Sequence, residues 1–137
     1  MTKQIVFSEE ANPPLPVYCE LRAIDLPAAQ AVISGKTIYV SGSIGITRDM
    51  KLVEGGVQAQ TRAALDNMTK VLKGAGVGLE SVLKANVYLT NLQRDFAPMN
   101  EVYLEYFSSN PPARTCIGVA ALPLGADVEI ECIAELP

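Results

Sequence analysis

Apolar residues recur at two different spacings along the chain, and each spacing predicts a different kind of element. From Val57 to Leu72 and from Asp95 to Phe107 they recur every three or four residues, which predicts two amphipathic helices. Gly74 stands where a glycine commonly ends a helix, and Pro111 and Pro112 stop the second one. Short apolar or alternating segments predict strands over residues 3–7, 31–34, 37–41, 82–89, 114–121 and 128–134.

The order of these elements, β-β-β-α-β-α-β-β, predicts an α+β fold. Two helices of moderate length can cover one face of a sheet this wide, but not both. The other face is therefore expected to meet water or another copy of the chain. The chain shows no internal repeat and no low-complexity linker, and its 137 residues fit one domain over residues 1–137.

The last predicted strand separates two kinds of side chain. Val128, Ile130 and Cys132 alternate with Glu129 and Glu131, so one face is apolar and the other carries carboxylates. We expect the apolar face to lie under the helices.

The preceding strand places Arg114, Cys116, Gly118 and Ala120 on one face by the same alternation. We expect this face to be the one that the helices leave uncovered. Its small and weakly polar side chains resemble a subunit interface more than a solvated surface. The alternation therefore predicts a homo-oligomer.

Composition narrows the possible chemistry. The chain has no histidine, which removes Ser-His-Asp and Cys-His arrangements together with the commonest metal ligand. Its three cysteines have no close pair and make no zinc site, so we expect no metal. The net charge of -4 argues against a nucleic acid or an anionic membrane as the partner.

The same features suggest where the protein resides. Three cysteines without a close pair indicate a reducing compartment. The N-terminal stretch MTKQIVFSEE has no long apolar segment, and no apolar run approaches the ~20 residues that span a bilayer. We expect a cytoplasmic protein without a membrane span, and a mitochondrial location stays open.

Arg114 is the first candidate for function. Its simplest interpretation is a surface arginine that pairs with a carboxylate such as Glu129. The alternative is a clamp, because a guanidinium presents a rigid fork of donors that fits a carboxylate. Glu129 and Glu131 lie about 6.5 Å apart along one strand, which suits either a solvated edge or the orientation of a water.

The other candidates also have two interpretations. Cys116 is favoured as a small core residue over a nucleophile, because no histidine is present to lower its pKa. Ser41 and Gly42 end a strand, where they form a turn or offer a hydroxyl and a backbone amide to a ligand. Asn100 on the second helix is either a satisfied polar group or a site residue.

One long segment resembles a known family. The stretch PPARTCIGVAALPLGADVEIECIA, from Pro111 to Ala134, closely resembles the signature of the Rid family, also called YjgF. Supporting similarity lies in Thr37–Gly45, Lys51–Asn67 and Val82–Phe107, so that the resemblance covers most of the chain from about Ala31.

This resemblance implies a fold, an assembly and an activity. The fold would be the chorismate-mutase-like α+β sheet with two helices, assembled as a homotrimer around a central barrel. The activity would be hydrolysis of short 2-imino acids, formed from enamines such as 2-aminoacrylate, to 2-keto acids and ammonia. No metal or organic cofactor would be needed, and the sites would lie in clefts between subunits.

The resemblance also implies roles for individual residues. Arg114 matches the arginine that grips the substrate carboxylate, and Glu129 matches the glutamate that helps to place the attacking water. The other matches line the pocket: Ser41, Gly42, Asn100 and Cys116.

Two departures from the family pattern leave alternatives open. Ser43 stands where many members have glutamine. The family's substrate-contacting tyrosine matches Tyr18, followed by an insertion over Leu21–Gln30, or it is replaced by Ala28 in an alignment without a gap. Loss of this tyrosine would favour a regulatory trimer that binds a carboxylate metabolite without turnover. A third alternative is an endoribonuclease or translation inhibitor, against which the acidic charge and the missing histidine argue.

Overall fold

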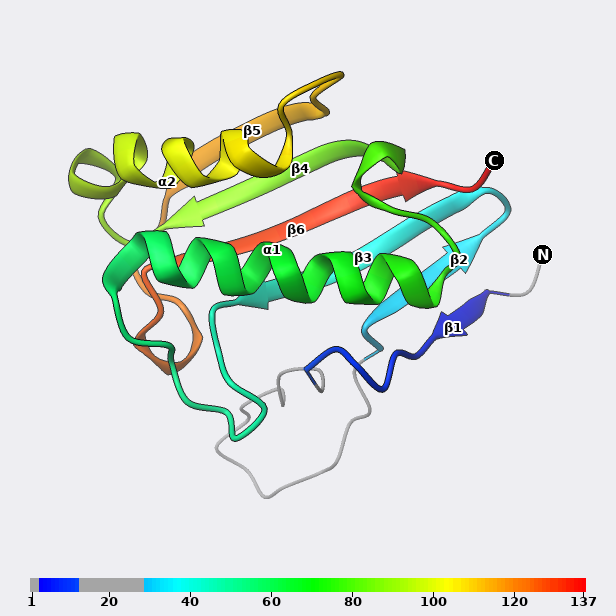
Figure 1. The fold of residues 1–137 in the computed structure, drawn as a ribbon, viewed down its shortest axis with the longest axis horizontal. Helices are drawn as coiled ribbons and strands as arrows, with labels where there is room; N and C mark the ends of the chain where they lie inside the picture. The colour runs from blue at the N-terminus through cyan, green and yellow to red at the C-terminus, as the bar shows by residue number, and fades with distance from the viewer. Residues whose placement is uncertain (1–2, 13–28) are drawn as a thin grey trace.

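The structure is a computed structural model that describes residues 3–12 and 29–137. Within these residues one mixed sheet has the strand order β1-β2-β3-β6-β4-β5, and only the β4–β5 pair is parallel. The elements are β1 Gln4–Val6, β2 Ala31–Ser34, β3 Thr37–Ile44, α1 Gly56–Gly74, β4 Val82–Leu89, α2 Leu92–Tyr106, β5 Ala113–Gly118 and β6 Val128–Glu135. Both helices lie on the same face of this sheet (Figure 1).

The predicted element order is confirmed, with changes at several ends. Strand β5 stops at Gly118 instead of continuing to position 121, and β3 continues to Ile44. Helix α2 begins earlier than the apolar pattern indicated, because the Asn91 side chain accepts a hydrogen bond from the Arg94 N–H at 3.1 Å and caps the first turn. In the described part of the chain, neither helix is both long and apolar enough to cross a membrane.

The prediction that the first helix ends at Gly74 is confirmed, but Gly74 does not adopt the left-handed conformation. Gly74 is the last residue of α1, and the left-handed conformation comes two residues later, at Gly76 with a φ of 84°. A Cβ at Gly74 would lie 3.2 Å from the Cβ of Ser8 and 3.3 Å from the carbonyl oxygen of Phe7. The missing side chain therefore lets the N-terminal segment pass close to the end of α1.

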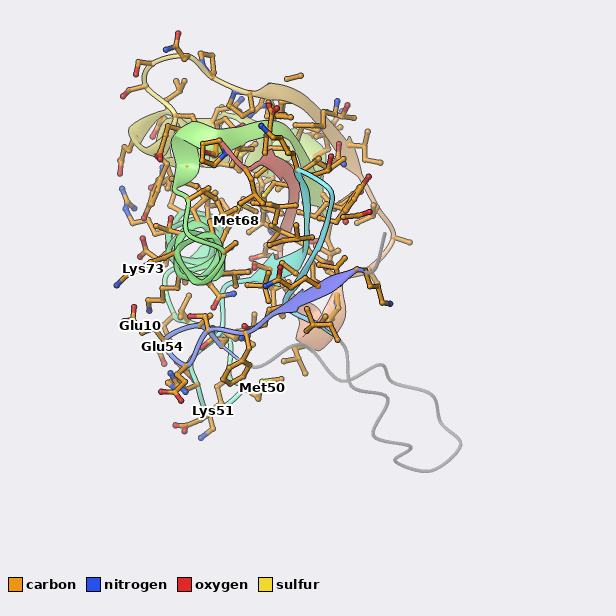
Figure 2. All side chains as sticks on the ribbon, turned by 90° about the vertical axis from the view of Figure 1, so that its right-hand side faces the viewer. Glu10, Met50, Lys51, Glu54, Met68 and Lys73 are labelled. Carbon is orange, nitrogen blue, oxygen red and sulfur yellow. The ribbon has the colours of Figure 1, made fainter. Side chains whose placement is uncertain are left out.

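The core lies between the two helices and the sheet. Helix α1 contributes fully buried Leu65, Met68 and Leu72, which pack against buried residues of the sheet such as Ile130 and Val87. Figure 2 shows Met68 on the side of α1 that faces the sheet and Lys73 on the opposite side. The apolar spacing of this helix thus corresponds to the side that it buries.

The register of β4 decides which side chains lie under the helices. Ala85 pairs with Cys132 on β6 and with Arg114 on β5, and Val87 pairs with Cys116. Paired residues share a face of the sheet, so Arg114 and Cys116 lie on the same face as buried Cys132, under α2. The expectation that they lie on the uncovered face is wrong, because alternation within one strand does not specify which set faces inward.

The uncovered face carries the other set of residues. Glu129 pairs with Tyr88, and Glu131 pairs with Asn86. The prediction for β6 is therefore confirmed: Val128, Ile130 and Cys132 are buried, and the two glutamates point away from the helices.

Two leucines test how much the core stabilises the fold. Leu65 is 0% exposed on α1, whereas Leu104 is 62% exposed on α2. We expect Leu65→Ala to lower the free energy of unfolding by about 2–5 kcal/mol, since it removes buried methyl groups and leaves a cavity. Leu104→Ala should change it by about 0.5 kcal/mol or less. Urea unfolding of both variants measures the difference, and equal effects would contradict the packing described here.

Candidate functional site

The guanidinium of Arg114 is held between the edge strand β5 and helix α2. Its Nη1 donates a hydrogen bond to the Asn100 Oδ1 at 2.6 Å. Its Cζ lies 4.7 Å from the ring centroid of Tyr103 and 5.9 Å from that of Phe96. These distances fall within the range of cation–π contacts, so the two rings stabilise the charged group.

The local sequence explains this arrangement. Phe96, Asn100 and Tyr103 follow one another at intervals of four and three residues, which places them on one face of α2. That face lies over β5, where Arg114 is half-buried. A single helix therefore supplies both the hydrogen bond and the two rings.

Arg114 has no ion pair with a carboxylate among residues 3–12 and 29–137. The interpretation that it pairs with Glu129 is therefore wrong, since Glu129 lies on the other face of the sheet. Only one of the five guanidinium N–H donors is used within the described residues. As far as residues 3–12 and 29–137 are concerned, the remaining donors are available to a planar anion.

Cys116 lies next to this group on the same face of β5. Burial raises the pKa of its thiol, and the Arg114 charge opposes that increase. Burial also raises the pKa of Cys132, to about 12. A raised pKa disfavours the thiolate, which argues against Cys116 and Cys132 as nucleophiles.

A second cluster lies on the uncovered face, where β3 meets the start of β6. The register of this pair shifts between Val40 and Ser43, which leaves Ser41 and Gly42 outside the regular ladder. A Cβ added at Gly42 would overlap the Glu129 carboxylate, so the missing side chain at Gly42 leaves room for this carboxylate in its present place. Ser41 donates its hydroxyl to the Ala29 carbonyl oxygen at 2.6 Å, which leaves the hydroxyl oxygen as an acceptor.

A shallow cavity of about 280 Å³ opens beside this cluster. Its lining includes Ser41, Tyr39 and Val32. It provides room for a small molecule next to the irregular part of β3.

The two glutamates of β6 have different surroundings. Glu131 accepts hydrogen bonds from the Tyr88 hydroxyl at 2.6 Å and from the Asn86 side chain at 3.2 Å. Glu129 accepts none from any described side chain. Burial, and after it the negative charge of Glu131, raises the pKa of the Glu129 carboxyl. A raised pKa makes Glu129 a stronger base than an ordinary carboxylate.

Within one chain, the predicted site residues therefore form two groups on opposite faces of the sheet. Arg114, Asn100 and Cys116 lie under α2, and a second set lies on the uncovered face: Ser41, Gly42 and Glu129. Tyr18 and Ala28 lie outside the described residues. In the described ranges, no group of three His, Cys, Asp or Glu side chains could hold a metal ion.

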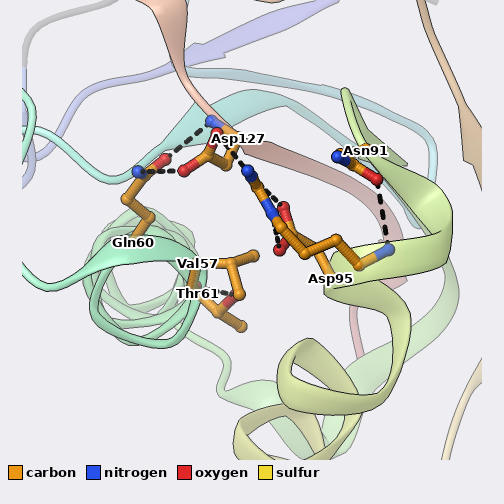
Figure 3. A network of polar contacts seen from close by, with 7 residues as sticks. Val57, Gln60, Thr61, Asn91, Asp95 and Asp127 are labelled. Carbon is orange, nitrogen blue, oxygen red and sulfur yellow. Dashed lines mark hydrogen bonds and ion pairs between the residues drawn. The ribbon is translucent and has the colours of Figure 1, made fainter.

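A polar network that the sequence patterns do not reveal lies at the end of the sheet where β6 begins. Gln60 on α1 and Asp95 on α2 are both buried, and Figure 3 shows them on either side of Asp127. The occurrence of polar residues at helix positions that become buried is the sequence feature that could have indicated this network. Their partners are distant in sequence, so the alternation within each element could not identify them.

Comparisons with known proteins agree with the fold and the motifs. A family model described as Endoribonuclease L-PSP matches residues 23–136. The chain belongs to the Rid family. This membership confirms the resemblance found in the sequence.

Two sequence relatives in the Rid family are similar over most of their length. The RutC family protein UK114 of Drosophila melanogaster is 50% identical over 109 residues, which cover 79% of this chain and 78% of the relative. The human 2-iminobutanoate/2-iminopropanoate deaminase is 46% identical over 109 residues, which cover 79% of each chain.

Solved structures of Rid proteins share this architecture. The crystal structure of YEO7 from yeast has a TM-score of 0.87 at 35% identity, over 99% of this chain and 100% of that chain. E. coli TdcF, crystallised with bound serine, has a TM-score of 0.83 at 30% identity, over 98% of this chain and 99% of that chain. These matches confirm the α+β fold with a six-stranded mixed sheet and two helices.

The Tyr88 hydroxyl offers a direct test of the uncovered face. The hydrogen bond to Glu131, together with burial, raises the pKa of Tyr88 to about 12. A tyrosine with a raised pKa favours folding while it is protonated, so this contribution is complete below about pH 10 and is lost as the pH rises towards 12. We expect Glu131→Gln to lower the pKa of Tyr88, as measured by NMR titration of labelled tyrosines. Glu135→Gln on the same strand is the matched control and should leave the pKa of Tyr88 unchanged.

Proposed function

We propose that this protein hydrolyses short 2-imino acids to 2-keto acids and ammonia. The observation that carries the proposal is Arg114, a half-buried guanidinium fixed by Asn100 and two aromatic rings and without a carboxylate partner among the described residues. Such a group is prepared for a ligand carboxylate, because its orientation is set before the ligand arrives. The names of relatives such as the human deaminase support the choice of substrate.

The reaction needs little catalytic power. The carbon of a protonated imine is already electrophilic, so a positioned water can add its oxygen there while Glu129 accepts the proton. Glu129 then returns this proton to the nitrogen, the C–N bond breaks as the C=O bond forms, and ammonia leaves with the last hydroxyl proton as ammonium. The raised pKa of the Glu129 carboxyl suits it to this exchange. Most of the rate enhancement would come from placing the water and the carboxylate together.

We further propose that each site is shared between copies of the chain. Arg114 and Glu129 lie on opposite faces of the sheet within one chain, so one ligand can meet both only if they come from different subunits. The uncovered face, with half-exposed Tyr39 and Ile117, suits burial against another copy. Assembly as a chorismate-mutase-like homotrimer around a central barrel would bring the two groups together at three clefts.

The role of Arg114 can be tested against another arginine. Arg114→Ala should lower kcat/KM for 2-iminobutanoate by about 30-fold or more, because truncating a charged partner of the ligand typically costs about 2–5 kcal/mol. Arg62→Ala is the control, since Arg62 forms an exposed ion pair with Glu105 at 2.7 Å. An Arg114→Ala protein that retained the activity of Arg62→Ala would contradict the proposal.

The sharing of sites predicts complementation between two variants that each retain only a low residual activity. Subunits with Arg114→Ala and subunits with Glu129→Gln, unfolded and refolded together in equal amounts, should recover about a quarter of the wild-type sites. The recovered sites combine Arg114 from one subunit with Glu129 from another. Each variant refolded alone is the control, and the subunit number is measured by native mass spectrometry. If mixing restored no activity although mixed oligomers formed, both residues would have to act from one chain.

A binding role without turnover is the second candidate. The family match begins at residue 23, so it includes Ala28 and leaves out Tyr18, which favours the alignment in which the family tyrosine is missing. Calorimetry with 2-oxobutanoate would detect Arg114-dependent binding in a protein that accelerates no imine hydrolysis. RNA cleavage that is lost in Arg114→Ala would instead support the third candidate, an endoribonuclease.

A further inference from the structure

Asp127, at the entrance to β6, has all its polar groups engaged. Its N–H donates to the Gln60 Oε1 at 2.8 Å, and its Oδ2 accepts from the Gln60 Nε2 at 3.0 Å. Its Oδ1 accepts from the Arg94 Nη2 at 3.3 Å, and its carbonyl oxygen accepts from the Thr90 N–H at 3.1 Å. Figure 3 shows how Gln60 and Asp127 face each other through two parallel contacts.

The partners of Asp127 are themselves fixed in place. Gln60 is 5% exposed, and its backbone lies so close to Gly45 that an added Cβ there would overlap it. Arg94 is held by two hydrogen bonds of 2.8 Å to the buried carboxylate of Asp95. The two helices thus hold the start of β6 from opposite sides (Figure 3).

Glu129 follows Asp127 by two residues on β6, and its carboxylate has no hydrogen-bond donor of its own among the described side chains. Glu131 on the same strand, by contrast, receives two hydrogen bonds from side chains. Gly42 leaves a space without a side chain on one flank of this carboxylate. The place of the Glu129 carboxylate is therefore set by its backbone, which pairs with Tyr88 on β4 and with Ile44 on β3. Asp127 fixes the end of β6 that immediately precedes these pairs.

We propose that Gln60 and Asp127 are positioning residues that hold Glu129 where it can orient the attacking water. This inference rests on the proposed imine hydrolysis, to which it adds residues that do not touch the ligand. A displacement of about 1 Å in a catalytic group can cost about 100-fold in rate. Loosening the start of β6 should therefore reduce the rate of the chemical step while leaving the Arg114 group intact.

The first test separates turnover from binding. In Asp127→Ala and Gln60→Leu, we expect kcat to fall by about 10-fold to 100-fold, with KM for 2-iminobutanoate changed by less than about 3-fold. Asp127→Asn should lose less, because its remaining oxygen can still accept a bond from Gln60. Binding of 2-oxobutanoate, measured by calorimetry, should stay unchanged and also shows that each variant is folded.

The matched control is Glu105→Ala. Glu105 also links α2 to α1, through its exposed ion pair with Arg62, but it lies far from β6 in the sequence. We expect this variant to keep the wild-type kcat. If it lost as much activity as Asp127→Ala, general loosening of the helices would explain the effect and the proposal would fail.

The second test asks whether the network acts through Glu129. In a Glu129→Gln background, Asp127→Asn and Gln60→Leu should cause no further loss of kcat, because the group that they position no longer exchanges a proton. Losses of kcat that multiply in the double variants, or a raised KM with an unchanged kcat, would overturn the assignment.

If the wild type and Glu105→Ala both lack turnover, the proposed reaction fails and this inference fails with it. Normal wild-type turnover with unaffected Asp127 variants would overturn this inference alone.

Discussion

The pairing of β4 with β6 on one side and β5 on the other is the constraint on which the chemistry of this molecule depends. Helices α1 and α2 cover one face of these three strands. Any residue in register with Ala85 or Val87 therefore points towards the helices and must be accommodated in a buried or half-buried position. Cys132 and Cys116 are accommodated as small apolar groups. Arg114 is accommodated because α2 offers two aromatic rings and an amide oxygen. A shift by one residue would exchange the faces and expose the whole set.

The sequence was sufficient to predict the elements, their order and the inward side of β6. Each of these follows from a repeat within one segment, such as the alternation of Val128, Ile130 and Cys132. The face of Arg114 could not be predicted in this way, because it depends on a register between strands that the pattern of one strand does not contain. The end of α1 at Gly74 was predicted, but its close packing was not, since its neighbours Phe7 and Ser8 come from the other end of the chain.

The candidate site, too, could be predicted from the sequence only in part. The motif led to Arg114, Asn100 and Glu129 as individual residues, and the structure places the first two within 2.6 Å of each other. It did not indicate that Glu129 lies on the opposite face, nor that Gln60 and Asp127 pair across 67 positions of sequence. Residue types and spacing can name the chemical groups of a site, but the contacts that orient them come from distant segments.

The aromatic surroundings of Arg114 also have a consequence for ions in solution. An exposed cation is surrounded by water and mobile anions, and its attraction for a ligand falls steeply as salt is added. The guanidinium of Arg114 already lies against the ring of Tyr103, so α2 covers one side of this group. Small anions therefore have few directions of approach, and they lack the shape to use the remaining donors as a planar carboxylate does. A group enclosed in this way should distinguish metabolites from chloride even at the ionic strength of a cell.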